Sequence, residues 1–319
     1  MVANANLYGY WIIEFQYSRY LPTDQKLKEM KGDGILEAIF PLLFSIPEDM
    51  ELKGAVTVIT GGARGIGRAI AEAYADRGAR VAIVDILADQ VQATANEMRE
   101  VGANVLPIHT DITIPSQVDE MVARVKDELG AIDILVNNAG SLSALGPIWD
   151  VDRENWFRDV TVNLYGTFLC CQAVVKDMIQ NNGGYIINLT TGMGGPHLYT
   201  TGYDTSKTGV VKLTEALAQE AKEYGVKTFA LVPGAVLTKM TEFIMESPEG
   251  KKWRPTFRNT FEKGRGTPPE LAAKLAVELV SGKADALTGR YFDARSDLAE
   301  IINQTDEILE KDRFVLRLR

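Results

Sequence analysis

Tyr203 and Lys207 are spaced so that their side chains can act together in proton transfer. They are four residues apart, so on a helix they share one face. A tyrosine hydroxyl ordinarily has a pKa of about 10, and a neighbouring ammonium group favours the phenolate and is expected to lower that pKa. The pair is therefore a candidate acid/base, which gives a proton to a carbonyl oxygen or takes one from an alcohol.

A glycine-rich segment earlier in the chain can hold phosphate groups. Residues 60–67 read Thr-Gly-Gly-Ala-Arg-Gly-Ile-Gly and lie between an expected strand and an expected helix. Gly61, Gly65 and Gly67 permit a tight turn and a close approach of backbone N–H groups to phosphate oxygens, on the N-terminus of the helix. Asp85 ends the next expected strand, where a carboxylate accepts hydrogen bonds from the hydroxyls of an adenosine ribose.

Asp85 also bears on the choice between NAD and NADP. Its carboxylate repels a 2′-phosphate, and the next residue, Ile86, supplies no cation to replace it. We therefore expect NAD as the cofactor. Arg64, within the glycine-rich segment, can contact a 2′-phosphate or lie over the adenine, so NADP stays the alternative.

Strand-like and helix-like segments alternate from about residue 50 onward. Short apolar runs rich in β-branched residues predict strands, and helical stretches that end at glycines predict helices. This alternation predicts an α/β fold, a single doubly wound domain with a central parallel sheet and helices on both faces. We expect strands at residues 55–60, 81–85, 104–109, 134–136, 185–189 and 228–232, and helices at 66–77, 88–100, 115–129, 155–179, 203–224 and 270–280.

The motifs, in this order, resemble those of the short-chain dehydrogenases/reductases, in the compact and not the extended branch. The resemblance runs from about residue 50 to residue 292 and includes Asn-Asn-Ala-Gly at 137–140 and Pro-Gly-x-x-x-Thr at 233–238. The extended branch needs a glycine at position 64, where this chain has Arg64. The divergent enoyl reductases space Tyr and Lys seven residues apart, and this chain has Thr200 seven residues before Lys207.

The resemblance implies a role for each matching residue. Tyr203 is the acid/base, Lys207 tunes it and binds the nicotinamide ribose, and Asn163 holds a water of the proton relay. Asp111 resembles the family's adenine-contacting acid. The implied cofactor-binding set comprises Gly61, Arg64, Gly65, Ile66, Gly67, Asp85, Asp111, Ile112, Asn138, Ala139, Gly140, Tyr203, Lys207, Pro233, Gly234, Val236 and Thr238.

The chain departs from the family at the hydroxyl that orients the substrate oxygen. The family usually has serine at this strand end, and this chain reads Asn-Leu-Thr-Thr at 188–191. Alignment of the motif selects Thr191, whereas the family's usual distance to the tyrosine would select Thr190. Either hydroxyl donates and accepts as serine does, and the extra methyl group narrows the pocket.

The implied activity is NAD-dependent hydride transfer between nicotinamide and a secondary alcohol or ketone, with Asn163, Thr191, Tyr203 and Lys207 as the catalytic set. An NADP-dependent carbonyl reductase of the same family is one alternative. A non-catalytic dinucleotide-binding regulator or scaffold is another, although such a protein needs neither Tyr203 nor Lys207. The sequence leaves open the substrate, its stereochemistry and the favoured direction of the reaction.

Composition narrows the partners and the location. The net charge of −9 disfavours a nucleic-acid partner, because an acidic surface repels phosphate backbones. The two cysteines, Cys170 and Cys171, are adjacent and are read as reduced thiols, and with two histidines in the chain no metal site is expected. We find no transmembrane span or secretory signal and expect a cytoplasmic protein.

Three regions are expected along the chain. Residues 1–49 are an extension outside the resemblance, residues 50–292 are the dehydrogenase domain, and residues 293–319 are a helical tail with one amphipathic helix at 298–311. A substrate lobe is expected at about 239–266, and its candidate contacts are Met240, Phe243, Ile244, Trp253, Phe257 and Phe261. The loop at 191–203 adds Met193, His197 and Tyr199, although His197 is expected to be a solvated loop residue.

The resemblance implies a homodimer or homotetramer paired through the helices at 155–179 and 203–224. The apolar residues of the tail are expected to pack on a neighbouring subunit or to cap the substrate lobe, and we favour the first.

Overall fold

The computed structural model describes residues 51–195 and 197–317. The prediction that residues 1–49 form a separate extension lies outside these residues. The other expectations on fold can be compared with the structure element by element.

Seven parallel strands form the central sheet of the described residues, in the order β3-β2-β1-β4-β5-β6-β7. This confirms the predicted doubly wound α/β fold. The strands are β1 (Val56–Thr60), β2 (Arg80–Asp85), β3 (Val105–His109), β4 (Ile134–Asn137), β5 (Gly184–Leu189), β6 (Val226–Val232) and β7 (Tyr291–Asp293). Six of them follow predicted runs closely, because strands buried on both faces are continuous apolar segments.

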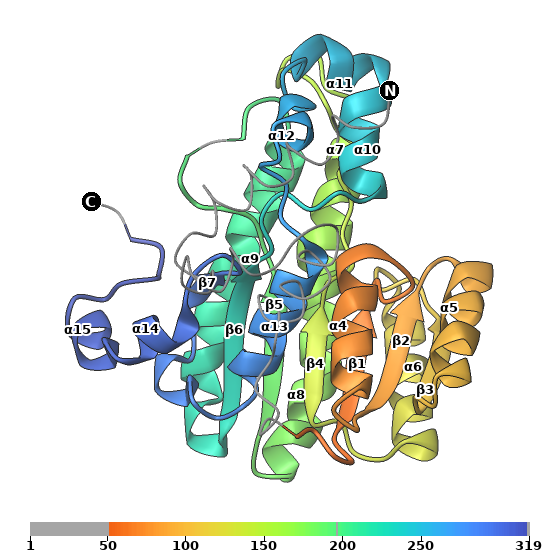
Figure 1. The fold of residues 1–319 in the computed structure, drawn as a ribbon, viewed down its shortest axis with the longest axis vertical. Helices are drawn as coiled ribbons and strands as arrows, with labels where there is room; N and C mark the ends of the chain where they lie inside the picture. Colours follow the sequence, from red (N-terminus) through yellow and green to blue (C-terminus); the bar gives the residue numbers. More distant parts are fainter. Residues whose placement is uncertain (1–50, 196, 318–319) are drawn as a thin grey trace, which may run out of the picture. The chain divides into compact units, whose positions relative to one another are not determined.

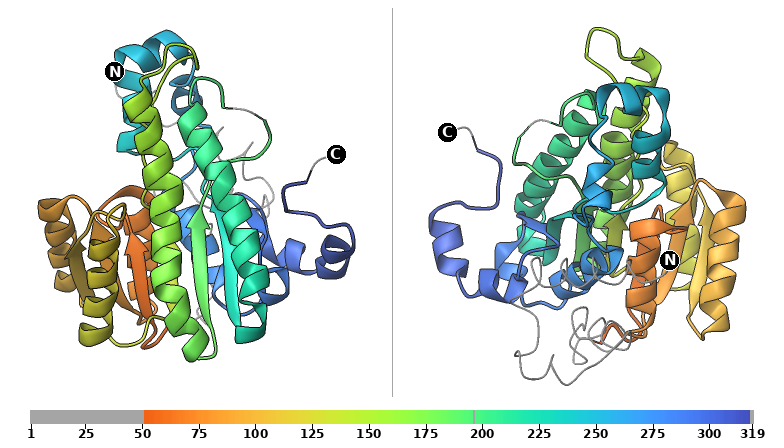
Figure 2. Two further views of the ribbon diagram at one scale, coloured as in Figure 1. Left: turned by 180° about the vertical axis from the view of Figure 1, so that it is seen from behind. Right: turned by 45° about the horizontal axis from the view of Figure 1, so that its top comes forward.

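Helices cover both faces of the sheet. One face, turned toward the viewer in Figure 1, carries α4 (Gly65–Ala75), α5 (Ala88–Glu100) and α13 (Pro269–Leu279). The other face, seen from behind in Figure 2, carries α6 (Pro115–Glu128), α8 (Thr167–Gln180) and α9 (Thr201–Glu220). Single 3₁₀ turns follow at Lys222–Tyr224 and Asp285–Leu287. The buried side chains of α6 and α8 pack on β1, β2 and β4 in one continuous apolar cluster.

The strand order reverses between β1 and β4, which lie side by side although β2 and β3 intervene in the sequence. Thr60 at the end of β1 is in register with Asn137 at the end of β4. In open α/β sheets, ligands bind in the crevice outside the carboxyl ends of the strands at such a reversal. The topology therefore places the glycine-rich segment and the Asn-Asn-Ala-Gly segment on opposite sides of one crevice.

The helix predicted at 155–179 is one continuous rod with a change of winding in the middle. It comprises α7 (Arg153–Val160), a π-helical segment η1 (Thr161–Gly166) and α8. A period of 3.6 residues in the sequence cannot reveal a segment wound at i→i+5. Such π segments occur frequently at functional sites, and this one contains Asn163.

The expected substrate lobe consists of three short helices, α10 (Lys239–Glu246), α11 (Pro248–Trp253) and α12 (Asn259–Glu262), which lie beyond the carboxyl ends of the strands (Figure 1). Their boundaries are set by capping. The Thr238 hydroxyl accepts from the Thr241 N–H to begin α10, and the Ser247 hydroxyl accepts from the Gly250 N–H to begin α11.

The single helix expected in the tail was wrong. Two helices, α14 (Leu298–Ile302) and α15 (Thr305–Glu310), replace the one predicted at 298–311. The Thr305 hydroxyl donates to the Ile302 carbonyl oxygen at 2.6 Å, which favours a break at this point. Farther along the tail, Phe314 stacks on Phe292 of its own chain at 6.0 Å, and its carbonyl oxygen accepts from the Tyr291 N–H at 3.0 Å.

Candidate active site

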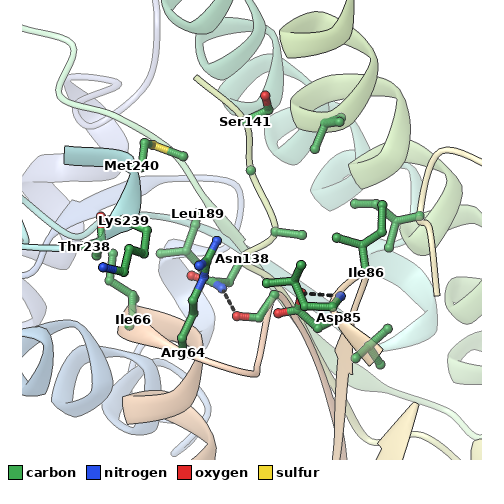
Figure 3. A pocket seen from close by; sticks show the side chains of 18 of the residues that line it. Arg64, Ile66, Asp85, Ile86, Asn138, Ser141, Leu189, Thr238, Lys239 and Met240 are labelled. Atoms are coloured by element: carbon green, nitrogen blue, oxygen red, sulfur yellow. Dashed lines mark hydrogen bonds between the residues drawn. The ribbon is translucent and has the colours of Figure 1, made fainter. Parts of the chain in front are cut away.

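A cleft of about 620 Å³ opens at the carboxyl ends of the strands (Figure 3). The segments that follow β1, β2, β3, β4, β5 and β6 all contribute to its lining, as do α7, α9 and α10. Of the predicted cofactor-binding residues, the cleft is lined by Gly61, Arg64, Gly65, Ile66, Asp85, Asp111, Ile112, Asn138, Ala139, Gly140, Tyr203, Lys207, Pro233 and Thr238. Residues from eight separated parts of the sequence thus surround one space.

The glycine-rich segment is held against the end of β4 by side-chain hydrogen bonds. Asn138 donates from its amide to the carbonyl oxygens of Thr60 at 3.0 Å and Gly61 at 2.9 Å. The Thr60 hydroxyl accepts from the N–H groups of Asn138 and Ala139, both at 3.1 Å. These bonds fix the two walls of the crevice relative to each other.

Glycine is required in this segment for two different reasons. Gly61 has φ +63°, and a Cβ atom there would lie 2.8 Å from Nδ2 of Asn138. At Gly67 an added Cβ would lie 2.2 Å from the carbonyl oxygen of Gly61, so this glycine permits helix α4 to pack on the turn. Gly67 supports the cleft from behind and is not part of its lining.

The N-terminus of α4 is free to bind an anion. Arg64 occupies the cap position with extended backbone and makes no side-chain capping bond within the described residues. The first helical residues, Gly65 and Ile66, line the cleft, and no acidic residue lies in the first turn. Uncapped backbone N–H groups and the helix dipole together favour a phosphate at this position.

Asp85 lies at the end of β2 with its carboxylate held by backbone donors. One oxygen accepts from the Ala63 N–H at 3.2 Å and the other from the Leu87 N–H at 3.1 Å. Each oxygen keeps a lone pair for a further donor. The side chains of Ile86 and Leu87 line the cleft beside it and are exposed.

Arg64 and Asp85 line different sides of the cleft. Figure 3 shows Arg64 near Thr238 and Lys239, whereas Asp85 lies with Ile86 on the opposite side. Lys239 forms an ion pair with Glu242 at 2.7 Å. Within the part of the chain that the structure describes, no carboxylate pairs with the exposed Arg64 guanidinium, so it is available to an anion in the cleft.

Gly234 and Val236, predicted cofactor contacts, do not line the cleft. Gly234 has φ +78°, and a Cβ atom there would lie 2.2 Å from Oγ1 of Thr267. Val236 is buried, and its carbonyl oxygen accepts from the Thr241 hydroxyl at 3.0 Å. Both positions shape the chain between Pro233 and Thr238, which do line the cleft.

Tyr203 and Lys207 lie on α9 and both reach the cleft. Lys207 is buried, and its ammonium group donates to the Leu189 carbonyl oxygen at 2.8 Å. Burial lowers the pKa of Lys207 to about 8. Lys207 also lies close to the loop after β4, because an added Cβ at Gly140 would be 3.7 Å from its Nζ.

The predicted lowering of the Tyr203 pKa was wrong for the protein alone. Burial, together with the negative charges of Asp204 and Asp159, raises the pKa of Tyr203 to about 12, and a hydrogen bond with Thr191 opposes the rise. Helical spacing correctly predicts that Tyr203 and Lys207 share a face. Helical spacing cannot reveal that burial and two carboxylates raise the Tyr203 pKa. Nor can it reveal that the Lys207 ammonium group is directed to Leu189.

The two threonines after β5 have different partners. Thr190 is buried, and its hydroxyl donates to the Lys207 carbonyl oxygen at 2.8 Å. Thr191 is half-buried and hydrogen-bonds to Tyr203. Of the two hydroxyls left open by the sequence, the geometry favours Thr191 as the one beside the tyrosine oxygen.

Asn163 is fully buried and connects the loop after β4 to α9. Its amide donates to the Ser141 carbonyl oxygen at 2.8 Å and to the Ser206 hydroxyl at 3.0 Å, and its Oδ1 accepts from the Ser141 N–H at 2.8 Å. Both amide hydrogens are therefore taken by protein groups, which leaves Oδ1 and the backbone carbonyl oxygen to accept from a relay water.

Sequence reasoning missed several residues of the lining. Some adjoin the recognised motifs, and adjacency is the signal that would have found them: Thr110, Ser141, Val162 and Lys239. Others carry no signal in the sequence, because only the fold brings them to the cleft: Gln90, Arg158 and Glu242.

The aromatic residues expected in the substrate lobe largely pack on one another. Tyr199 lies 5.2 Å from the Trp253 ring, and Phe257 lies 5.8 Å from Phe261, between ring centroids. Tyr199 has φ +67°, which is uncommon for a residue with a side chain. His197, expected to be a solvated loop residue, is half-buried and pairs with Asp204 at 2.6 Å.

Residues 51–195 and 197–317 contain no group of three or more His, Cys, Asp or Glu side chains placed to hold a metal ion. They also contain no helix long and apolar enough to cross a membrane.

The fold is that of a known family. Residues 55–249 match the family model described as short chain dehydrogenase. The chain therefore belongs to the short-chain dehydrogenase/reductase family, which confirms the resemblance in the sequence, and it is an oxidoreductase of that type.

Individual relatives cover most of the chain. It is 36% identical over 249 residues to D-threitol dehydrogenase of Mycolicibacterium smegmatis, with 77% of this chain and 93% of the relative covered. It is 41% identical over 189 residues to sorbitol dehydrogenase of Cereibacter sphaeroides, with 59% and 72% covered. Among solved structures it is similar to a 7α-hydroxysteroid dehydrogenase complexed with NADH and 7-oxo glycochenodeoxycholic acid, at 28% identity and a TM-score of 0.69, with 77% and 94% covered.

Proposed function

We propose that this protein transfers a hydride between NAD and a secondary alcohol or ketone. The observation that carries the proposal is that Tyr203 and Lys207 line a crevice suited to a dinucleotide, with Thr191 hydrogen-bonded to Tyr203. Tyr203 serves as the acid/base, Thr191 orients the substrate oxygen, and Lys207 holds the nicotinamide ribose. Two of the relatives named above are dehydrogenases of sugar alcohols, which supports a secondary alcohol as the substrate class.

The residues present fit NAD. Gly61 permits the turn to pack closely on Asn138, and the uncapped start of α4 offers backbone N–H groups to a pyrophosphate. Asp85 and Asp111 would hold the adenosine part, and Pro233 and Thr238 lie where the nicotinamide carboxamide would bind. When bound, NAD supplies the hydride acceptor or donor and, in its oxidised form, a positive charge beside the phenol.

The chain's own groups perform the proton transfer. In the oxidation direction, the Tyr203 phenolate takes the proton of the substrate hydroxyl, and in reduction the neutral phenol returns it. With a pKa raised to about 12, the phenol is protonated at neutral pH in the protein alone, so it holds the proton that ketone reduction requires. The Thr191 hydroxyl, which hydrogen-bonds to Tyr203, donates toward the phenolate when it forms.

The electrostatics of the cleft support NAD over NADP. Asp85 stands at the ribose end with free lone pairs, and a 2′-phosphate there would meet a negative charge. NADP remains a second candidate because Arg64 has no carboxylate partner among the described residues. Its position near Lys239, across the cleft from Asp85, suits the pyrophosphate better than the 2′-phosphate.

The test is the change in nicotinamide absorbance with a panel of acyclic polyols, cyclic secondary alcohols and the matching ketones. Each is offered with NAD(H) and with NADP(H). Turnover that prefers NAD supports the proposal. Tight NAD binding without turnover across the panel would contradict it and favour the non-catalytic alternative, and turnover that prefers NADP would overturn the choice of cofactor.

A further inference from the structure

A buried carboxylate lies one helical turn before Asn163 and has no part in the proton transfer described above. Asp159, on α7, is fully buried. Its oxygens accept hydrogen bonds from four donors: the hydroxyls of Ser141 at 2.7 Å and Ser143 at 2.8 Å, the N–H of Ser143 at 2.8 and 3.0 Å, and the N–H of Ala144 at 3.0 Å. One side chain thus holds the whole segment 141–144.

All of these donors are neutral. Within residues 51–195 and 197–317, no lysine or arginine forms an ion pair with Asp159. Burying a carboxylate without a cation is costly unless its lone pairs are filled, and here they are filled by groups of one short segment. Removing the carboxylate would leave buried backbone N–H groups of Ser143 and Ala144 without an acceptor, so the segment would have to move.

The segment leads directly into the site. Ser141 lines the cleft and follows Gly140, one of the residues expected to contact the cofactor. Asn163 holds the N–H and the carbonyl oxygen of the same Ser141, both at 2.8 Å. Asp159 and Asn163 are four residues apart on one rod, so they hold successive parts of this wall from the same side.

We propose that Asp159 is a positioning residue for hydride transfer, which fixes the Ser141–Ala144 segment and thereby the wall of the cleft next to Asn163 and Tyr203. The inference rests on the proposed function. Asp159 fixes the substrate side of the cleft only. The glycine-rich segment on the cofactor side is fixed by hydrogen bonds from Asn138, which do not involve Asp159.

The charge of Asp159 has a second effect that a purely structural residue would lack. The charged groups that act on Tyr203 are Asp159 from α7 and Asp204 from α9. Asp204 also pairs with His197 of the preceding loop, and Lys207 lies one turn after Tyr203 on α9. Asp159 and Asp204 both raise the pKa of Tyr203. Neutralising Asp159 therefore moves the pH dependence of the reaction to lower pH.

The test compares Asp159→Asn with Asp152→Asn in the full chain. Asp152 caps the same rod, accepting from the Asn155 N–H at 2.8 Å, and is exposed, so it controls for a general loss of helix stability. Three quantities are measured: kcat/KM for the alcohol against pH, the dissociation constant of NAD from quenching of tryptophan fluorescence, and hydrogen exchange of the segment 141–151.

We expect Asp159→Asn to lower kcat/KM between about 10- and 100-fold, since small misplacements at a site cost this much. The midpoint of the pH profile should fall by roughly one unit. Exchange of the segment should speed up, while NAD affinity stays within about twofold of the wild type. Asp159→Glu, which keeps the charge, should return the midpoint toward that of the wild type even if kcat/KM stays low.

An active wild type whose Asp159→Asn variant keeps both its pH midpoint and its kcat/KM would overturn the inference. So would a variant that loses stability and activity in the same proportion as Asp152→Asn with no shift of the midpoint. A failure of the proposed function is visible separately, in a wild type that turns over none of the alcohols, and would overturn both.

Discussion

The side-chain amide of Asn163 donates a hydrogen bond to the Ser206 hydroxyl at 3.0 Å, and that hydroxyl donates to the carbonyl oxygen of Tyr203 at 2.7 Å. A residue in the π-helical segment of one long helix is thus connected to the backbone of the tyrosine on another. Ser141, held by the same amide, joins the loop after β4 to this pair. The site is built from three elements that meet through one buried side chain.

Asn163→Ala should therefore disturb both the stability and the reaction. The substitution leaves the buried N–H and carbonyl oxygen of Ser141 without partners, which should lower the free energy of unfolding by roughly 2–4 kcal/mol. We expect kcat to fall more than NAD affinity, because the glycine-rich segment is held elsewhere. Denaturant unfolding and steady-state kinetics check this, with Asn155→Ala on the same rod as the control. Equal effects of the two variants would contradict the role given to Asn163.

The lowered pKa of the buried Lys207 predicts an unusual dependence of the free energy of unfolding on pH. Its pKa is about 8 in the folded protein, against 10.5 for an exposed lysine. Between these values the unfolded chain binds a proton that the folded chain does not, so stability rises with pH across the window. Relative to Lys207→Met, the wild type should gain about 3 kcal/mol in total between pH 8 and pH 10.5.

Urea unfolding of the protein without cofactor at several pH values measures this gain. Lys212→Met serves as the control, since Lys212 lies on the same helix, is exposed and should show no such trend. A constant difference between wild type and Lys207→Met across the window would mean that Lys207 titrates as an ordinary surface lysine.

Asp85 predicts the cofactor preference. Asp85→Asn keeps the shape of the side chain and removes the charge that repels a 2′-phosphate and accepts from the ribose hydroxyls. We expect the ratio of kcat/KM with NAD to that with NADP to fall by roughly 10–100-fold. Asp89→Asn, an exposed carboxylate in the first turn of α5, should leave the ratio unchanged. An unaltered ratio in Asp85→Asn would place the discrimination elsewhere, with Arg64 the first residue to examine.

The long helix predicts how copies of the chain associate. Phe157, Tyr165 and Phe168 are exposed along α7, η1 and α8, and the last two stack at 6.3 Å. We expect a homodimer or homotetramer that pairs through this helix and α9, which lie side by side on one face (Figure 2). Tyr165→Asp should reduce the mass measured by light scattering to that of a smaller assembly, whereas Val101→Asp, at an exposed position after α5, should not. A monomeric wild type would refute the expectation.

The sequence predicted the sheet and the motifs well, because both depend on local patterns. Buried parallel strands are apolar runs, and the glycines at 61, 65 and 67 are demanded by backbone conformation and close contact. Asp159 could not have been found this way, since its role depends on four donors that the fold brings to it. The raised pKa of Tyr203 was missed for the same reason: charge and burial act through space and not along the chain.

The substrate lobe was predicted only as a region. Its helices are four to eight residues long, too short to show a helical period, and α10 and α11 begin at the capping hydroxyls of Thr238 and Ser247. Of the apolar residues expected to contact the substrate, Tyr199 and Trp253 pack on each other, as do Phe257 and Phe261. Only Met240 among them lines the cleft.

The most direct test of the account is Tyr203→Phe, assayed with the best alcohol found and compared with Tyr185→Phe. Tyr185, at the opposite end of β5, also has a pKa raised to about 12, and its hydroxyl donates to Asp285 at 3.1 Å. We predict that Tyr203→Phe lowers kcat by about 10²–10⁴-fold while NAD binding is retained, and that Tyr185→Phe keeps its activity. Turnover by Tyr203→Phe within a few-fold of the wild type would contradict the proposal that this tyrosine transfers the proton.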